Sequence, residues 1–139
     1  MIWKREYTIE ELNSRPKAHI GALVGIEFTL IEKDSISARM PVDERTHQPY
    51  GILHGGASVV LAETLGSVAS NMIVDEKYMA VGLEVNANHL RPVRSGFVTG
   101  ICKPIHIGGK THVWDIRLFD DRGKMSCISR LTVAIILRT

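Results

Sequence analysis

The sequence is poor in cysteine, proline and aromatic residues. It contains two cysteines and five prolines in 139 residues, and aromatic residues make up only 6%. Two cysteines cannot build a disulfide framework, and neither Cys102 nor Cys127 belongs to a CxxC pair. No apolar run approaches the roughly 18–20 residues that cross a bilayer, and the first residues lack the apolar core of a signal peptide. We therefore expect a cytoplasmic protein rather than a secreted or membrane protein.

Charge is nearly balanced along the chain. The 17 lysines and arginines stand against 15 aspartates and glutamates, a net charge of +2, and the basic residues form no block. Proteins that bind nucleic acid or a membrane surface need such a block, so we expect neither partner. The six histidines include no HxxxH pair, and we expect no metal site. The length predicts one domain, residues 1–139, with a sizeable core.

The hydrophobic pattern predicts one long helix and a series of strands. Apolar residues occur on nearly every face of segment 55–75, which is typical of a buried helix wrapped by a sheet. A short helix is predicted to begin at Thr8, because Glu11 follows three residues later as in a capping box. Alternation predicts a hairpin in 24–42, broken at 32–35, and strands in 81–89, 97–107, 113–119 and 125–137. This order predicts an α+β fold with an antiparallel sheet.

Several residues receive a structural interpretation. Pro104 predicts a bulge in its strand or an edge position. His112 is expected to lie on a turn without a functional role. Turns are predicted at 108–109 and 121–123. Four further side chains are expected to pack rather than to react, namely Trp3, Cys102, Trp114 and Cys127.

Glu63 is the anomalous residue of the long helix. It is flanked by Leu61-Ala62 and Thr64-Leu65, where a charge is costly unless it is paired or used in chemistry. At helical spacing Gly66, Ser67 and Ser70 share its face, which would leave room beside the carboxylate. Glu63 is therefore a candidate catalytic residue, and a glutamate on a solvated stripe is the alternative interpretation.

The sequence His54-Gly55-Gly56 opens the same helix. Glycine lets a ligand approach the backbone, and the first N–H groups of a helix are unpaired donors with partial positive charge. Such donors suit a developing oxyanion. A glycine-rich turn that only leads into the helix is the alternative interpretation.

The spacing between these two candidates has a geometric consequence. Gly55 and Glu63 are eight residues apart, about 12 Å along a helix at 1.5 Å per residue, so one carbonyl group cannot touch both in one chain. If they cooperate, Glu63 of one subunit must meet His54 and Gly55 of another, with the two helices antiparallel. This hypothesis predicts an isologous homodimer with two shared sites.

Two motifs carry a family resemblance. Residues 48–57 read QPYGILHGGA and precede Glu63, and residues 82–92 read GLEVNANHLRP and precede Gly96. With these motifs the chain resembles, over nearly its whole length, the hotdog-fold acyl-CoA thioesterases of the phenylacetate-pathway type. It is most similar to the aryl-CoA branch, which includes the 1,4-dihydroxy-2-naphthoyl-CoA hydrolase of menaquinone synthesis and the proofreading thioesterase of enterobactin synthesis. The resemblance implies a central helix wrapped by a curved antiparallel sheet, in agreement with the element order.

The resemblance also implies catalytic roles. Glu63 matches the catalytic carboxylate, which attacks the thioester carbonyl or activates a water, and Gly55 matches the residue whose N–H stabilises the oxyanion. Gln48 and His54 match side chains that orient the carbonyl. Ser67 matches a position that holds the carboxylate or the water. No separate cofactor is implied, because CoA is part of the substrate.

The substrate-binding residues are implied in the same way. The strand at Gly82 matches a backbone that pairs with the pantetheine arm, and Arg91 matches a phosphate contact. The acyl pocket is expected along the second half of the long helix, at Val68 and Met72, with neighbours from the partner chain. Lys103 and Lys110 are candidates only by charge. The segments that match nucleotide-binding positions are His89, Leu90, Arg91 and Pro92, together with His106, Ile107, Gly108 and Gly109.

The activity so implied is hydrolysis of an acyl-CoA with an aromatic acyl group, such as 1,4-dihydroxy-2-naphthoyl-CoA or benzoyl-CoA, to the free acid and CoA. A misacylated carrier protein is an alternative substrate, since it differs from CoA only beyond the phosphopantetheine. A hydroxyacyl-carrier-protein dehydratase fits less well, because Gln48 is present and the spacing from His54 to Glu63 is nine. A non-catalytic acyl-CoA-sensing module is the remaining alternative. The branch typically pairs dimers, so we expect a dimer of dimers.

Overall fold

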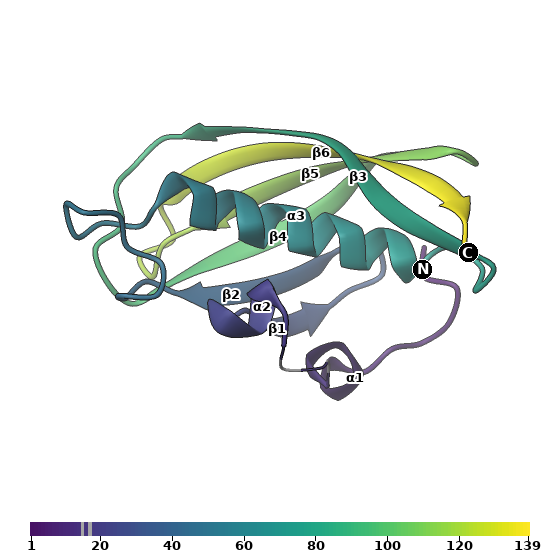
Figure 1. The fold of residues 1–139 in the computed structure, drawn as a ribbon, viewed down its shortest axis with the longest axis horizontal. Helices are drawn as coiled ribbons and strands as arrows, with labels where there is room; N and C mark the ends of the chain where they lie inside the picture. Colours follow the sequence, from purple (N-terminus) through teal and green to yellow (C-terminus); the bar gives the residue numbers. More distant parts are fainter. Residues whose placement is uncertain (15, 17) are drawn as a thin grey trace.

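One antiparallel sheet and one long helix form most of the structure (Figure 1). This computed structural model describes residues 1–14, 16 and 18–139. The elements are α1 Ile9–Asn13, α2 Ile20–Leu23, β1 Glu27–Ile31, β2 Ile36–Pro41, α3 Gly55–Asn71, β3 Tyr78–His89, β4 Phe97–Ile107, β5 Thr111–Phe119 and β6 Met125–Leu137. The strand order is β1-β2-β4-β5-β6-β3, and every neighbouring pair is antiparallel. The predicted α+β fold is confirmed.

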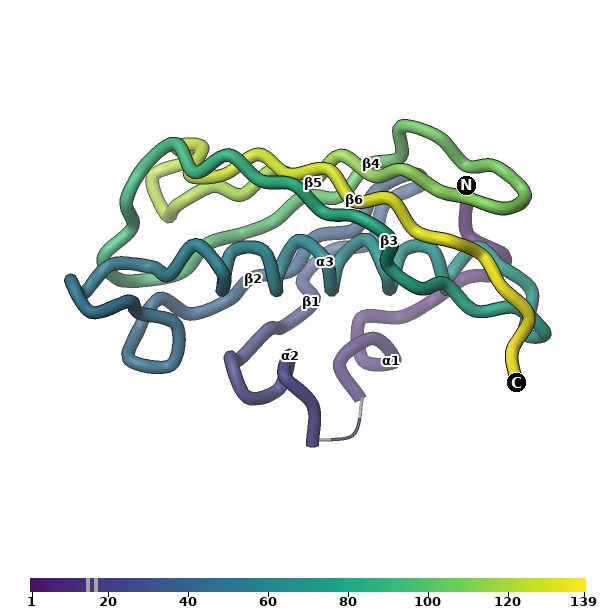
Figure 2. The backbone as a smooth tube through the Cα atoms, turned by 45° about the horizontal axis from the view of Figure 1, so that its top comes forward, coloured from purple at the N-terminus to yellow at the C-terminus, as the bar shows by residue number. Residues whose placement is uncertain are grey.

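The sheet curves around α3, which lies across its concave face (Figures 1 and 2). Leu61 and Leu65 of the helix are completely buried, and each such side chain contributes about 1.5–3 kcal/mol of hydrophobic free energy. The residues that face them from β5 and β6 are also fully buried, namely Trp114, Ile116, Leu118, Leu131 and Val133. This contact fixes the position of α3 and hence of every side chain on it.

Two glycines let the helix and the sheet approach closely. A Cβ on Gly66 would lie 2.4 Å from Leu131 Cδ2, and a Cβ on Gly100 would lie 2.6 Å from Leu65 Cδ1. Neither position accommodates even a methyl group unless a leucine moves. Gly66 therefore packs against the sheet, and the expectation that it leaves room beside Glu63 is wrong.

A buried polar cluster joins the second half of α3 to β5. Ser70 Oγ accepts a hydrogen bond from Trp114 Nε1 at 2.7 Å and lies 2.8 Å from His112 Nδ1. Ser70 is therefore committed to the core and is not available beside Glu63. His112 is only 2% exposed, so the expectation that it decorates a turn is wrong. Because β5 begins at Thr111, the period of two places His112 on the inner face with Trp114.

The end of α3 also differs from the prediction. The helix ends at Asn71 rather than near Asp75. Asn71 joins this end to β3, because its Nδ2 donates to the Ser67 carbonyl at 2.9 Å and its Oδ1 accepts from the Ala80 N–H at 3.1 Å. The four-residue helix α2 is absent from the sequence prediction. Its N-cap is His19, and histidine is not among the usual cap residues.

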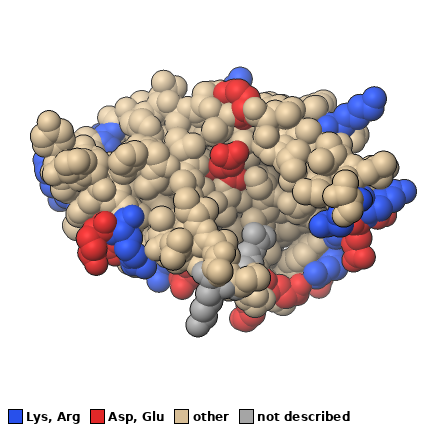
Figure 3. Space-filling model, in the orientation of Figure 1, with Lys and Arg blue, Asp and Glu red and all other residues tan. Residues whose placement is uncertain are grey.

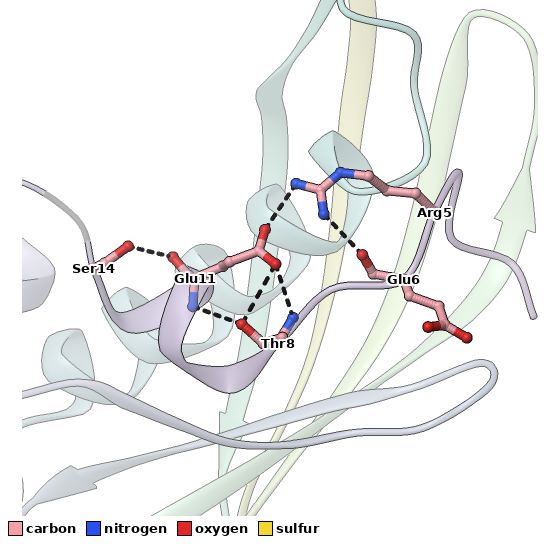
Figure 4. Close-up of polar contacts among 5 residues, drawn as sticks. All are labelled: Arg5, Glu6, Thr8, Glu11 and Ser14. Carbon is pink, nitrogen blue, oxygen red and sulfur yellow. Dashed lines mark hydrogen bonds and ion pairs between the residues drawn. The ribbon is translucent and has the colours of Figure 1, made fainter.

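The N-terminal helix α1 begins as predicted. Thr8 Oγ1 accepts from the Glu11 N–H at 3.1 Å, and Glu11 Oε1 accepts from the Thr8 N–H at 3.3 Å, which completes the capping box (Figure 4). Arg5 pairs with the Glu11 carboxylate at 2.8 Å, and this hydrogen bond lowers the pKa of that carboxyl. Leu12 is buried, so α1 is anchored to the core on its inner side.

The remaining local predictions agree with the structure. The register of β4 against β5 shifts between Pro104 and His106, which is the predicted bulge, and turns occur at 108–109 and 121–123. The four side chains expected to pack are each 5% exposed or less. Burial raises the pKa of both thiols, Cys102 and Cys127. Within the described part of the chain, no helix is both long enough and apolar enough to cross a membrane.

The buried histidine leads to a prediction about pH and stability. Burial lowers the pKa of His112 from its ordinary value of 6.5, so the unfolded chain binds this proton more readily than the folded chain. His112 should therefore cost no stability above pH 6.5, the ordinary pKa of histidine. The free energy of unfolding should fall as the pH drops from that value through the lower pKa of the folded state. His112→Asn cannot titrate and should flatten this part of the profile, measured by urea unfolding between about pH 5 and 8.

The matched control is His106→Asn, at an exposed position of the neighbouring strand, whose charge is the smallest of the causes that act on the pKa of His112. This variant should keep most of the wild-type dependence on pH. An unchanged profile in His112→Asn would contradict the role given to the buried imidazole.

Candidate active site

The N-terminus of α3 consists of a histidine cap and two glycines. His54 Nδ1 accepts from the Gly56 N–H at 2.7 Å, and the His54 carbonyl accepts from the Ala57 N–H at 3.0 Å. In the described part of the chain, the Gly55 N–H has no acceptor. It lies at the positive end of the helix dipole, so it can donate to an oxygen of a bound molecule.

The cap also fixes the proton on the His54 ring. A neutral imidazole carries one N–H, and since Nδ1 accepts the bond from Gly56, the proton must be on Nε2. The side chain is exposed. His54 therefore presents a donor to the solvent side of the helix terminus.

The loop before α3 holds a second polar side chain, that of Gln48. The Gln48 N–H donates to the Ile52 carbonyl at 2.8 Å, and the Gly51 N–H donates to the Gln48 carbonyl at 3.0 Å, which closes the loop. Gln48 Oε1 accepts from the Tyr50 N–H. The amide NH2 is thus the part of this side chain that can bind another group.

A pocket of about 370 Å³ opens beside these donors. Gly55 touches the end of β3 there, because a Cβ on Gly55 would lie 2.7 Å from His89 Nε2. The lining residues are Gln48, Ile52, Leu53, Gly55, Ser58, His89, Leu90, Arg91, Pro92 and Ser126. One chain therefore brings together two of the predicted catalytic residues and the predicted segment 89–92.

The chemistry of this end of α3 is that of an oxygen-binding site. Gln48 and Gly55, which line the pocket, carry N–H donors, and His54, which does not line it, carries a third beside Gly55. Gln48 Oε1 already accepts from the Tyr50 N–H of the loop, and His54 Nδ1 already accepts from the Gly56 N–H of the helix. The arrangement therefore suits a carbonyl oxygen that gains negative charge.

Glu63 lies elsewhere on the same helix. It is half-buried, and its carboxylate lies against β3, because a Cβ on Gly82 would be only 2.4 Å from Oε2. Ser67, one turn further along, is also half-buried. Glu63 does not line the pocket that holds Gln48 and Gly55. One chain therefore separates the predicted carboxylate from the predicted carbonyl donors.

A second pocket, of about 380 Å³, lies between α3 and the N-terminal helices. Val68, one of the two residues predicted for an acyl pocket, lines it together with Thr64 of α3, whereas Met72 does not line it. The other lining residues are Leu12, Asn13, His19, Ile20, Gly21, Ala22, Ile26 and Phe28. This pocket is mainly apolar, as a site for a hydrocarbon group must be.

The other predicted nucleotide segment, 106–109, lies at the opposite end of the sheet from Arg91. It forms the turn between β4 and β5, whereas Arg91 follows the end of β3, which is aligned with the far end of β5. The stretch of β5 from His112 to Leu118 separates the two, about 20 Å at 3.3 Å per residue. One chain therefore does not bring the two predicted nucleotide segments together. Lys103 and Lys110 are both exposed.

The sequence interpretation missed five polar residues that line the two pockets, namely Asn13, His19, Ser58, Thr64 and Ser126. Ser58 lies one helical turn after His54, a spacing that can be read from the sequence. Thr64 directly follows Glu63 in the sequence, so its place near the candidate carboxylate could also have been noticed. Ser126 reaches the first pocket only because β6 lies beside β3. His19 reaches the second pocket only through the fold of the N-terminal segment, and no sequence pattern marks it.

Comparison with known proteins gives one consistent result. A family profile described as the thioesterase superfamily matches residues 50–127. The 1,4-dihydroxy-2-naphthoyl-CoA hydrolase of Escherichia coli is 51% identical over 136 residues, which is 98% of this chain and 100% of that protein.

Two solved structures have almost the same fold. A mutant thioesterase from Pseudomonas aeruginosa superposes with a TM-score of 0.97 at 56% identity, covering 99% of this chain and 100% of that one. A thioesterase from Haemophilus influenzae superposes with a TM-score of 0.95 at 47% identity, covering 99% of this chain and 96% of that one.

The histidine cap generates a prediction about stability. His54→Ala removes the acceptor for the Gly56 N–H and should lower the free energy of unfolding by about 0.5–2 kcal/mol. His54→Asn should restore most of the loss, because asparagine caps helices well but lacks the outward Nε2 donor. Urea unfolding of the two variants distinguishes them, and equal stability of His54→Ala and wild type would show that the cap contributes nothing.

Proposed function

This chain belongs to the thioesterase superfamily, and from that premise we propose that it hydrolyses the thioester of an aromatic acyl-CoA to the free acid and CoA. The family resemblance and the hotdog fold expected from the sequence are confirmed, and the chain is an enzyme of the thioester hydrolase class. The proposed hydrolytic site rests mainly on one observation, the set of N–H donors at the start of α3.

These donors would bind the thioester carbonyl. The Gly55 N–H would take the negative charge that develops on the carbonyl oxygen, while Gln48 and His54 orient the group. Glu63 would either attack the carbonyl carbon or take a proton from the water that attacks it. In both cases the C–S bond breaks, CoA leaves as a thiolate, and no strong acid is needed because the thiolate is a good leaving group. If Glu63 attacks, water then hydrolyses the mixed anhydride between Glu63 and the acyl group, which releases the free acid and restores the carboxylate. Ser67 would hold the carboxylate or the water.

The separation of Glu63 from Gly55 supports a dimer with two shared sites. The outer side of α3 carries the half-buried residues Val60, Glu63 and Ser67, and the face of the molecule over α3 is mostly uncharged (Figure 3). Beside it β3 is an edge strand of the sheet, with Leu83 61% exposed. A two-fold axis here would pair the β3 edges and set the two α3 helices antiparallel, with Glu63 of each protomer near Gly55 of the other.

The CoA portion would extend from this point. The pantetheine arm would run along the backbone at Gly82, and Arg91, with the rest of 89–92, would hold the phosphates. Since 106–109 lies too far from Arg91 within one chain, this turn would reach the nucleotide of a neighbouring subunit. We therefore include a dimer of dimers in the proposal. CoA is part of the substrate and not a separate cofactor.

The second pocket supports an aromatic acyl group. Its wall is mostly apolar, but Asn13, His19 and Thr64 add three polar groups. His19 Nδ1 accepts from the Ala22 N–H at 3.3 Å, so the proton is on Nε2, which can donate to a ring hydroxyl. The E. coli relative is named for a dihydroxynaphthoyl substrate. An acyl group of this kind, and a place in cytoplasmic menaquinone biosynthesis, are therefore the most specific form of the proposal.

The first test is steady-state hydrolysis of a substrate panel. The panel contains 1,4-dihydroxy-2-naphthoyl-CoA, benzoyl-CoA, a medium-chain acyl-CoA and an aroyl carrier protein. Glu63→Gln should lower kcat by about 10²–10⁴-fold, because it removes the base or nucleophile while keeping the side-chain shape. Binding of acyl-CoA without turnover that depends on Glu63 would contradict the proposal. The best substrate distinguishes CoA from carrier-protein thioesters.

The second test concerns the oxyanion donor. Gly55→Pro deletes the N–H at the first helical position, which proline tolerates, and should lower kcat by about 10²–10³-fold. Gly55→Ala keeps the N–H and only displaces His89, so it should lose much less. Equal losses in the two variants would show that crowding of His89, rather than the donor, explains the effect.

The same substitution tests whether the sites are shared. A mixed dimer of a Glu63→Ala chain with a Gly55→Pro chain contains one intact site if the residues act across the interface. Its activity should return to about half that of wild type, measured on dimers purified through two different tags. No recovery in confirmed mixed dimers would contradict the cross-subunit geometry.

A further inference from the structure

Tyr50 is the most exposed large hydrophobic residue in the described part of the chain, and within one protomer it lines neither candidate pocket. Its exposed fraction is 87%, and it lies at the tip of the loop that connects Gln48 to Ile52. Leaving a tyrosine ring in water gives up most of the hydrophobic free energy that it could contribute. The fold itself does not use this ring.

The loop beneath Tyr50 is nevertheless well ordered by hydrogen bonds. The Tyr50 N–H donates to Gln48 Oε1, the loop closes through Gln48 and Ile52 at 2.8 Å, and the Leu53 N–H donates to the Val93 carbonyl at 2.8 Å. Gly51 has a φ of 76°, which only glycine adopts readily. An exposed aromatic ring on a preorganised loop is typical of a contact with another molecule, because little conformational entropy is lost on binding.

The proposed dimer indicates where this ring lies. The loop projects beyond the N-terminus of α3 (Figure 1). Tyr50 stands five residues before Gly55, and Val68 stands five residues after Glu63. When antiparallel helices bring Gly55 of one protomer to Glu63 of the other, the loop continues over the next turns of the partner helix, where Thr64 and Val68 line the second pocket.

We propose that Tyr50 of each protomer covers the acyl pocket of its partner, over the partner's Thr64 and the partner's Val68, and stacks against the aromatic acyl group. This inference rests on the proposed function and adds a specificity-determining residue to it. The occupant is a second copy of this chain, and the ligand is an aromatic ring attached to the thioester. The acyl pocket is then a composite, with its wall from one protomer and its cover from the other.

A kinetic experiment tests the contact with the acyl group. Tyr50→Ala should lower kcat/KM about tenfold for 1,4-dihydroxy-2-naphthoyl-CoA and much less for hexanoyl-CoA, since only the aromatic substrate stacks. Tyr50→Phe keeps the ring and should retain nearly full activity. Leu30→Ala, at an exposed position of β1 that lines neither pocket, is the matched control and should change neither value. Equal losses for both substrates, or no loss for either, would overturn the proposal.

A cross-linking experiment tests the placement without relying on activity. The photoreactive analogue p-benzoylphenylalanine replaces Tyr50, and the dimer is confirmed by its mass in solution before irradiation. Cross-links should join two chains and map to the peptide that carries Thr64 and Val68. Cross-links confined to one chain, or to other partner peptides, would overturn the proposal even if Glu63-dependent hydrolysis is observed. Absence of that hydrolysis in wild type would instead count against the proposed function.

Discussion

The rigid length of α3 is the constraint on which the rest of the structure depends. A helix does not bend to bring its first turn to its third, so Gly55 and Glu63 remain about 12 Å apart along the helix axis in every protomer. The curved sheet reinforces this separation. It holds the helix through fully buried leucines and through two glycines that admit no further atoms. The polar cluster of Ser70, His112 and Trp114 then fixes the rotation of the helix about its axis.

Within this frame the local hydrogen bonds determine what the site can recognise. Gln48 and His54 each use their acceptor atom to order the backbone beside them. What remains for a ligand is a group of N–H donors without a competing negative charge. The carboxylate that would repel a carbonyl oxygen lies on another turn, against the backbone of Gly82. Within one protomer, the fold therefore separates the N–H donors from the carboxylate by distance rather than by shielding.

The sequence predicted the elements whose signals are local. Alternation identified the strands, Pro104 identified the bulge, and Thr8 with Glu11 identified the capping box. The spacing of Gly55 and Glu63 was also readable, because it follows from helix geometry alone. Features that depend on distant pairing were not readable. His112 was assigned to a turn, and Ser70 and Gly66 were assigned to an open face, because nothing near them in sequence shows that the sheet packs there.

The candidate site shows the same division. Segment 89–92 and Gln48 were predicted from motifs, and the structure brings them to one pocket. Ser126 and His19 were missed, because they reach the pockets only through the pairing of β6 with β3 and through the path of the N-terminal segment. The roles of the predicted residues remain predictions.

The burial of the two cysteines has a chemical consequence for a protein of this class. A thiolate at the surface of a thioesterase would exchange acyl groups with its own substrate, and the protein would become S-acylated instead of releasing a free acid. Here both thiols lie in the core, and their raised pKa keeps them protonated and unreactive. Both cysteines therefore contribute to packing, and the thiol that takes part in thioester hydrolysis is the one that the substrate releases.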